Sequence, residues 1–380
     1  MADTILILGN GFDLAMKRKT SYEHFVEFVN NLLPVTDNQL KKFLDKNNIN
    51  IEKYKDNYYL RFINENRSTL GENWCNLEIM ISQLAEAIEY FKQNPDILYS
   101  KGKDYLKAIY SKQFHEFLVC QENYTSKFFI AEIFNEFFIV SEWNKLERRA
   151  ALSELNEKFI YHLELLTELL EIYLSYRDYV DFEVNKISPV ETALDAINNI
   201  SESSVISFNY THTPYELFKI PIENTHYIHG EIDLNGSKST VNTMVFGIED
   251  KENNVNSDLI PYQKYYQRVV KETGNLYEKF FISTKLSEWG AAVSKNIIVF
   301  GHSVDPLDKE IFEKCFKIAD LKRYNYRFIF TYHNESSKRS IIKNLAIILG
   351  KDKLVGLTGN KNVIFVKSDD VDGMREVLLD

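Results

Sequence analysis

One long stretch of this chain, from residue 103 to residue 188, contains neither glycine nor proline. Turns depend heavily on these two residue types, so a stretch without them is expected to be mostly regular. Apolar residues recur inside it at the spacing of one helix face, as at Phe159, Leu163 and Leu166. The pattern predicts helices at 103–119, 125–140 and 142–180, and we expect a further helix at 74–92.

Short apolar runs rich in β-branched and aromatic residues lie in the rest of the chain. They predict seven strands, at 4–8, 204–208, 226–228, 244–246, 296–300, 326–331 and 362–366. Several of these runs are apolar throughout, which is typical of strands buried on both faces of a parallel sheet. Helices are expected at 189–200, 278–293, 306–320 and 335–349. This alternation predicts an α/β fold with a Rossmann-like, mostly parallel sheet and right-handed crossovers.

The two patterns also divide the chain. We expect a Rossmann-like core made of residues 1–33 and 185–380, interrupted by an all-helical insertion domain at 34–184. A chain of 380 residues has room for such a division, because domains contain roughly 150 residues each. The polar stretch 233–260 is rich in Asn and Ser, and it is expected to form loops near the ligand-binding edge of the sheet.

Composition excludes several classes of protein. The chain has 55 acidic and 45 basic side chains and a net charge of −10, which disfavours non-specific binding to DNA. Its three cysteines, Cys75, Cys120 and Cys315, are too few for a four-cysteine zinc site, and no other metal cluster is expected. No segment approaches the ~20 apolar residues of a membrane helix. We therefore expect a cytoplasmic protein that does not bind membranes.

The first chemical motif is Gly9-Asn10-Gly11-Phe12-Asp13, directly after the first predicted strand. Glycines at a strand-to-helix turn let backbone amides approach a phosphate at the start of the helix. The motif lacks the third glycine of the dinucleotide fingerprint, so a tight structural turn is an equal alternative. Asp13 either binds ribose hydroxyls or caps the helix, and an isolated acidic residue more often caps.

Two further motifs follow the second and third predicted strands. Asn209 and Tyr210 come after the run 204–208, where an amide could hold a sugar hydroxyl or a water, or could bond its own backbone in a turn. His229 follows 226–228 and precedes a glycine. A histidine at such a place is suited to proton transfer near neutral pH. His226 lies on the opposite face of the strand and is expected to be structural.

A fourth motif follows the run 296–300, where a glycine and a hydroxyl precede a helix. Asp305 is expected to cap that helix, with Pro306 at its first position. The same motif contains the residues expected to face a ligand, namely Gly301, His302, Ser303 and Asp308. All four motifs stand at the carboxyl ends of predicted parallel strands, so we expect them to converge on one ligand-binding edge.

These residues resemble the bacterial abortive-infection family AbiH, which is associated with defence against bacteriophage. The segments that carry the resemblance span most of the chain, at 9–13, 20–22 with Phe25, 74–78, 207–211, 228–230 and 300–303. Their order also resembles a divergent sirtuin-type NAD-binding core. This chain departs from sirtuins at Asp13, where they carry a small hydroxyl residue, and at Thr211, where they carry an aspartate.

The sirtuin resemblance implies roles for the motif residues. Asn209 and His229 would form the catalytic pair. The NAD phosphates and ribose would meet Gly9, Gly11 and Asp13, and the adenosine end would meet Gly301 and Ser303. Sirtuin deacylases also carry a four-cysteine zinc module, which three scattered cysteines cannot form. The resemblance therefore favours an NAD glycohydrolase over a deacylase.

The expected function is that of an anti-phage effector that hydrolyses NAD to nicotinamide and ADP-ribose. The helical insertion would sense an unknown phage trigger or drive homo-oligomerisation. One alternative is a nucleotide-binding sensor or interaction protein that does not hydrolyse its ligand. A weaker alternative is a toxin directed at RNA, because no paired-carboxylate metal signature is present and the net charge is acidic.

Overall fold

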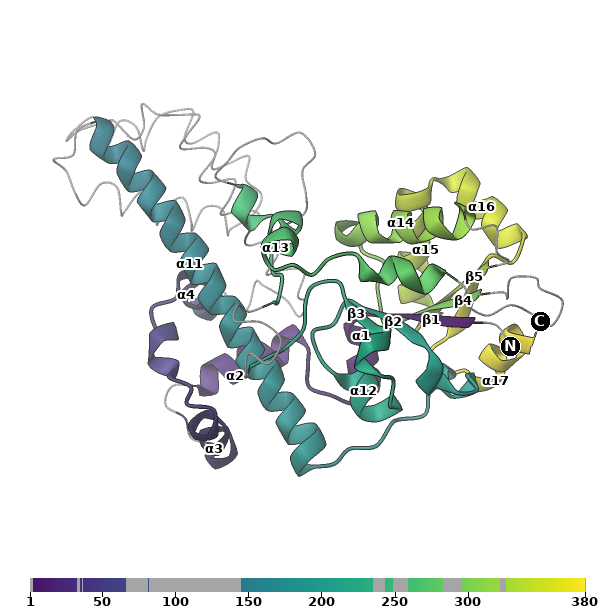
Figure 1. Ribbon diagram of the computed structural model, residues 1–380, viewed down its shortest axis with the longest axis horizontal. Coiled ribbons are helices and arrows are strands. Elements are labelled where there is room, and N and C mark those ends of the chain that lie inside the picture. Colours follow the sequence, from purple (N-terminus) through teal and green to yellow (C-terminus); the bar gives the residue numbers. More distant parts are fainter. Residues whose placement is uncertain are drawn as a thin grey trace. The chain divides into compact units, whose positions relative to one another are not determined.

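The computed structural model describes residues 3–32, 35, 37–65, 81, 145–234, 243–248, 259–282, 295–321 and 326–379 (Figure 1). The described strands are β1 (Asp3–Leu8), β2 (Ser204–Ser207), β3 (Thr225–Tyr227), β4 (Lys295–Phe300), β5 (Tyr326–Tyr332) and β6 (Val363–Lys367). The described α-helices are α1 (Asn10–Ala15), α2 (Tyr22–Asn31), α3 (Asn38–Lys46), α4 (Tyr58–Glu65), α11 (Lys145–Asp178), α12 (Thr213–Phe218), α13 (Lys264–Val270), α14 (Lys309–Leu321), α15 (Glu335–Leu349), α16 (Lys351–Gly359) and α17 (Val371–Leu379).

The six strands form one parallel sheet in the order β3-β2-β1-β4-β5-β6. Strand β1 lies near the centre, where Ile5 is paired with Ser204 of β2 and with Ile297 of β4. The chain therefore reverses its direction of strand addition between β1 and β4. This arrangement confirms the predicted Rossmann-like α/β class.

Side chains alternate between two cores, one on each face of the sheet. Ile5 and Ile7 of β1 enter a cluster with Phe312 of α14 and Leu345 of α15. The intervening Leu6 and Leu8 enter a second cluster that contains side chains of α1, α12 and α17, namely Phe12, Leu217 and Met374. Figure 1 shows α14 and α15 on one side of the sheet and α1, α12 and α17 on the other. Burial on both faces explains why these strands are apolar throughout.

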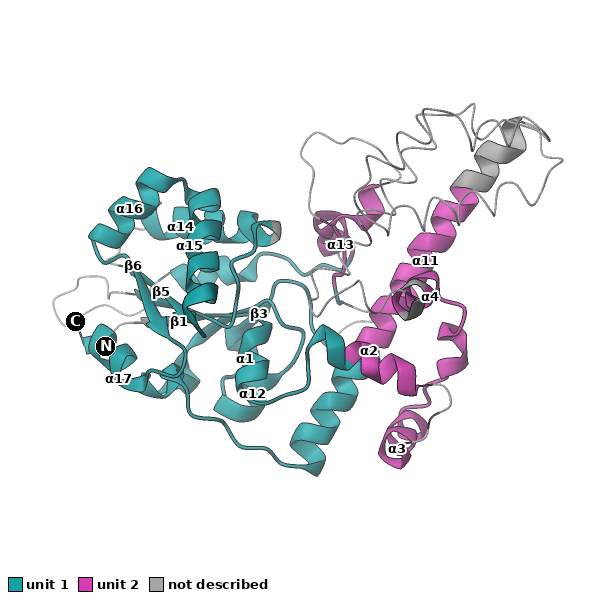
Figure 2. Ribbon diagram, turned by 180° about the vertical axis from the view of Figure 1, so that it is seen from behind, with its two compact units in different colours: residues 1–24, 171–244, 271–380 teal, residues 25–170, 245–270 magenta. Residues whose placement is uncertain are grey.

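The chain divides into two compact units (Figure 2). Unit 1 comprises residues 1–24, 171–244 and 271–380 and holds the whole sheet. Unit 2 comprises residues 25–170 and 245–270. These borders differ from the predicted ones, and the separate folding of 34–184 as an insertion domain stays a prediction.

In unit 2, the first part of α11 supplies an apolar face, as its spacing predicts. Leu155, Phe159, Leu163 and Leu166 are all buried. Polar contacts fix neighbouring segments to the same helix. The Asn57 Nδ2 donates to the His162 carbonyl at 2.6 Å, and the Tyr262 hydroxyl donates to Asn156 Oδ1 at 2.9 Å. Burial of this face, more than intrinsic propensity, stabilises so long a helix.

Two predicted elements are wrong. Residues 244–246 form no strand, because a side chain takes the place of a neighbouring strand. Gln267 accepts from the Phe246 amide at 2.8 Å and donates to its carbonyl at 3.0 Å. Residues 189–200 do not form one helix. A 3₁₀ helix at Ala193–Ala196 ends at Ile197, whose backbone is extended, and Asn199 adopts a left-handed conformation with φ 56°.

The other helix predictions have mixed outcomes. Helices α11 and α15 confirm 142–180 and 335–349, and a 3₁₀ turn at Pro306–Asp308 followed by α14 confirms 306–320. At 278–293 the described part is a 3₁₀ helix, Leu276–Phe281. The predicted helices 74–92, 103–119 and 125–140 lie outside the described residues, apart from residue 81, and so does the motif 74–78. Among the helices that are described, none has the length and apolar character needed to cross a bilayer.

Candidate functional site

The candidate site lies in unit 1, where the turn after β1 meets the loop after β4. The Gly9 amide donates to the Phe300 carbonyl at 3.0 Å, and the Gly11 amide donates to the Gly301 carbonyl at 2.8 Å. A Cβ atom on Gly9 would lie 2.6 Å from the Gly301 carbonyl oxygen. The glycines are therefore required by the close approach of two backbones, whether or not a ligand is bound.

Asn209 connects the end of β2 to this turn. Its Nδ2 donates to the Gly9 carbonyl at 3.0 Å, and its own amide donates to Ser207 Oγ at 3.1 Å. Asn209 is therefore fixed through both its side chain and its backbone, and the residue is 8% exposed. The structure thus brings Asn209 to the Gly9–Gly11 turn, as the sequence predicts.

His229, Asp308 and His302 form a second group at the same edge. The carboxylate of Asp308 lies between the two rings, with Oδ1 3.3 Å from His229 Nε2 and Oδ2 3.5 Å from His302 Nε2. The Val304 amide donates to Nδ1 of His302 at 2.8 Å. The fold therefore brings His229, which follows β3, to His302 and Asp308, which both follow β4.

An aromatic wall packs against these histidines. The Phe208 ring lies 5.6 Å from the His229 ring and 4.3 Å from the His302 ring, in edge-on geometry. It also stacks on Phe312 at 5.6 Å. Phe208 directly precedes Asn209, so one short segment links the amide to the imidazoles. The aromatic contacts surround the group with apolar atoms, and electrostatic interactions are stronger in such surroundings than in water.

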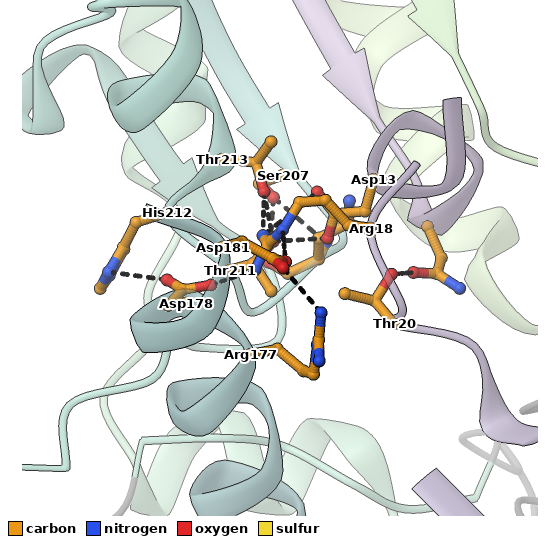
Figure 3. Close-up of polar contacts among 12 residues, drawn as sticks. Asp13, Arg18, Thr20, Arg177, Asp178, Asp181, Ser207, Thr211, His212 and Thr213 are labelled. Atoms are coloured by element: carbon orange, nitrogen blue, oxygen red, sulfur yellow. Dashed lines mark hydrogen bonds and ion pairs between the residues drawn. The ribbon is translucent and has the colours of Figure 1, made fainter. Parts of the chain in front are cut away.

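Asp13 does not cap a helix, because α1 begins at Asn10 and Asp13 lies inside it. Asp13 belongs instead to a buried polar cluster around Arg18 (Figure 3), whose side chain is fully buried. Arg18 Nε donates to Asp181 Oδ2 at 3.0 Å, and its other nitrogens bond Asp178 and Thr213. Thr211, two residues after Asn209, donates to Asp13 Oδ2 at 2.6 Å.

The electrostatics of this cluster follow from burial. Burial raises the pKa of the Asp13 carboxyl, although Arg18 and the hydroxyl of Thr211 act in the opposite direction. Burial alone would lower the pKa of Arg18, but the carboxylates of Asp178 and Asp13 more than offset it and raise that pKa. Arg18 is therefore always charged. The carboxylates around it compensate this buried charge, which would otherwise be costly in the protein interior.

The remaining predicted site residues make contacts of their own. Phe12 is buried in the core and packs against Phe218 and Phe300. Asn10 accepts from the Thr20 hydroxyl at 2.9 Å. Tyr210 is half-buried, and its carbonyl accepts from the Ile232 amide. Ser303 is exposed, and its carbonyl accepts from Asn344 Nδ2 at 3.1 Å.

His226 and the Arg18 cluster show what the sequence could and could not indicate. His226 is buried beside Tyr277, with its ring 5.4 Å from the tyrosine ring, in agreement with a structural role. Nothing in the sequence indicates that Arg18 is buried while Lys17 and Lys19 are exposed. The sequence also gives no indication that Asp178 and Asp181 bind Arg18, because a carboxylate near the end of a long helix carries no distinguishing pattern.

Comparison with known proteins places the chain in a family. The sequence model described as bacteriophage abortive infection AbiH matches residues 5–332. No curated protein and no solved structure matches the chain. The matched range runs from within β1 to the end of β5 and therefore includes the Gly9 turn, Asn209, His229 and Asp308. The chain belongs to the bacteriophage abortive-infection family AbiH, and its role lies in defence against bacteriophage.

Proposed function

We propose that this AbiH protein binds NAD at the edge between β1 and β4 and hydrolyses its nicotinamide–ribose bond. The strand order β3-β2-β1-β4-β5-β6 supports a dinucleotide ligand, because sheets of this order bind dinucleotides where the strand order reverses. The likeness of the core to sirtuins is part of the same proposal.

One observation carries the proposal. Asn209 Nδ2 donates to the Gly9 carbonyl at 3.0 Å, which holds an amide beside the point where the strand order reverses. His229 follows the neighbouring strand β3. Phe208, the residue before Asn209, packs its ring against the ring of His229. An amide at this place can orient a ribose hydroxyl or a water, and an imidazole nearby can accept a proton.

Hydrolysis of the nicotinamide–ribose bond requires little acid catalysis from the protein. The bond between ribose C1′ and the nicotinamide nitrogen breaks, and its electron pair neutralises the cationic ring as nicotinamide leaves. Water forms the new bond to C1′, and its proton passes to His229 and then to solvent. Asn209 orients the water and the ribose. Base catalysis of this kind contributes roughly 10²–10⁴-fold to a rate.

The contacts of the first turn restrict how the diphosphate binds. The amides of Gly9 and Gly11 already donate to Phe300 and Gly301, so phosphate contacts from these amides require the loop after β4 to move. Asp13 is 1% exposed and bonded to Thr211, so it reaches a ribose only after a similar rearrangement. The accessible predicted residues include Asn10 and Tyr210, which are half-buried, and Ser303, which is exposed.

The test is release of nicotinamide from NAD by purified protein. Asn209→Ala and His229→Ala are expected to abolish release while the protein stays folded. Asn360→Ala is the matched control, because Asn360 is exposed and precedes β6, at the edge of the sheet opposite the strand ends that carry the site. Equal turnover in all three variants would reject the assignment of Asn209 and His229.

Binding is measured separately, because an effector of phage defence can require a trigger before it acts. NAD and ADP-ribose are expected to raise the melting temperature, since a ligand that binds only the folded state stabilises it. A shift without nicotinamide release, even in phage-infected extract, would favour the sensor without hydrolysis. No shift and no release would reject NAD altogether. Within the proposal, segment 34–184 senses the phage trigger or drives homo-oligomerisation.

A further inference from the structure

His302, Asp308 and His229 form one line of contacts that the proposed function leaves unexplained. The Asp308 carboxylate contacts Nε2 of both rings, at 3.3 Å from His229 and 3.5 Å from His302. Both separations are slightly longer than the roughly 2.7–3.2 Å of most N–H···O bonds. Catalytic contacts are often long before a ligand binds and shorten in the complex. Asp308 is thus placed to orient both imidazoles.

Val304 determines which nitrogen of His302 carries the proton. Its amide donates to His302 Nδ1 at 2.8 Å, so Nδ1 accepts and carries no hydrogen. A neutral ring then has its proton on Nε2, the nitrogen that faces Asp308. Val304 has φ 55°, a left-handed conformation that is costly for a β-branched residue. A strained backbone is therefore retained at the residue that holds this ring.

The same reasoning extends to His229. An ionised carboxylate only accepts hydrogen bonds, so the His229 nitrogen that faces Asp308 must be the protonated one. That nitrogen is Nε2, which makes Nδ1 the basic atom of the neutral ring. We infer that His302 and Asp308 are positioning residues that hold His229 with Nδ1 as its proton acceptor. The catalytic use of Nδ1 rests on the proposed function, whereas the tautomer does not.

The surroundings support an ordered arrangement. The Phe208 ring contacts both imidazoles, and Phe312 packs at 5.1 Å from the His302 ring. The side chains of His229, His302 and Asp308 are only 9%, 7% and 14% exposed. In such an environment the rings exchange few hydrogen bonds with water, so the carboxylate decides their orientation. This role for Asp308 differs from the direct ligand contact that the sequence suggested.

The tautomers can be read by long-range proton–nitrogen NMR on protein with isotope-labelled histidine. The chain has eight histidines, and His229→Gln and His302→Gln assign the two signals. Both rings are expected to carry their proton on Nε2. In Asp308→Asn, His229 is expected to lose its single tautomer, while His302 keeps its own because Val304 still donates to it. A His229 ring protonated on Nδ1 in the wild-type protein would overturn the inference, and so would an unchanged His229 signal in Asp308→Asn.

Kinetics supply the second measurement. If the protein turns over NAD, Asp308→Asn is expected to lower kcat by roughly 10²–10⁴-fold with little change in KM, because the base is misoriented while binding is retained. Asp372→Asn is the control, since that carboxylate is exposed on α17. Equal melting temperatures exclude misfolding. NAD turnover with a Nδ1–H tautomer of His229 rejects only the inference, and the expected tautomers without any NAD binding or turnover reject only the proposed function.

Discussion

Arg18 Nε donates to Asp181 Oδ2 at 3.0 Å and joins positions 163 residues apart in the sequence. Through the same guanidinium, the segment after α1 is connected to the end of α11 and to Thr213 at the start of α12. The cation–π contact with Phe182, at 4.6 Å, covers the group further. The fixed fork of an arginine is suited to this task, because it reaches several acceptors at once.

Replacing Arg18 is expected to destabilise the fold strongly. Arg18→Met leaves the Asp13 carboxylate buried without its cation and leaves Asp181 paired with Arg177 alone. Breaking a buried pair in this way costs about 3–5 kcal/mol. Urea unfolding measures the loss. Arg375→Met is the matched control, because its ion pair with Asp372 is exposed and is worth under about 1 kcal/mol. Similar losses in the two variants would contradict the importance of the buried cluster.

Gly301 is expected to tolerate no side chain. Its φ is 68°, and an added Cβ would lie 2.1 Å from the Phe12 nitrogen. Gly350 also has a positive φ, 80°, but a Cβ there would meet nothing within 4 Å. Both alanine substitutions strain the backbone, at Gly350 in a region that favours glycine (φ 80°, ψ 147°), but only Gly301→Ala adds a steric clash. We expect Gly301→Ala to lose at least about 2 kcal/mol more than Gly350→Ala, and equal losses would show that the two loops can separate freely.

His226 is expected to make the fold sensitive to acid. Burial first, and then the charge of Lys279, lower the pKa of His226 to about 4. The unfolded chain takes up this proton near pH 6.5 and the folded protein only near pH 4, so stability is complete above 6.5 and falls as the pH drops toward 4. The loss attributable to His226 is about 3 kcal/mol.

Unfolding by urea at several pH values checks this expectation. His226→Gln should flatten the curve between pH 6.5 and 4, whereas His333→Gln should not, because His333 is exposed. An unchanged acid dependence in His226→Gln would mean that the ring finds a proton acceptor in the folded state.

Cys315 is expected to be unreactive in the folded protein. It is fully buried, and burial raises the pKa of its thiol to about 12, which leaves almost no thiolate to attack a thiol reagent. In a Cys75→Ser, Cys120→Ser background, modification should follow unfolding. Adding Ser336→Cys provides an exposed thiol as a positive control. Rapid labelling of Cys315 under native conditions would show that α14 opens easily.

The fold could be predicted because its central strands are unambiguous. The β1, β4 and β5 segments are short and mostly apolar, β-branched or aromatic, and a parallel sheet covered on both faces buries most of their side chains. The segment 244–246 has the same local character but no strand beside it, because Gln267 satisfies its backbone. Local pattern cannot distinguish these cases, since the difference lies in which partner is available.

The site was predictable to a similar extent. Asn209, Gly9 and Gly301 each follow a predicted strand, so the sequence predicts that they lie together, and their hydrogen bonds show that they do. The sequence suggested ligand contacts for Asp13, whereas burial and Arg18 place it in a structural cluster. Such an outcome depends on residues 160 or more positions away, and no spacing rule reaches that far.

The position of β1 has a consequence for synthesis. The first strand pairs on one side with residues 204–207 and on the other with residues 295–300. In a nascent chain, β1 can pair with β2 once residues 204–207 have left the ribosome, but its other edge stays unpaired until residues 295–300 have followed. Such late pairing is expected for a topology of high contact order. Interrupted translation products lack Gly301, His302 and Asp308, so they cannot assemble the cluster.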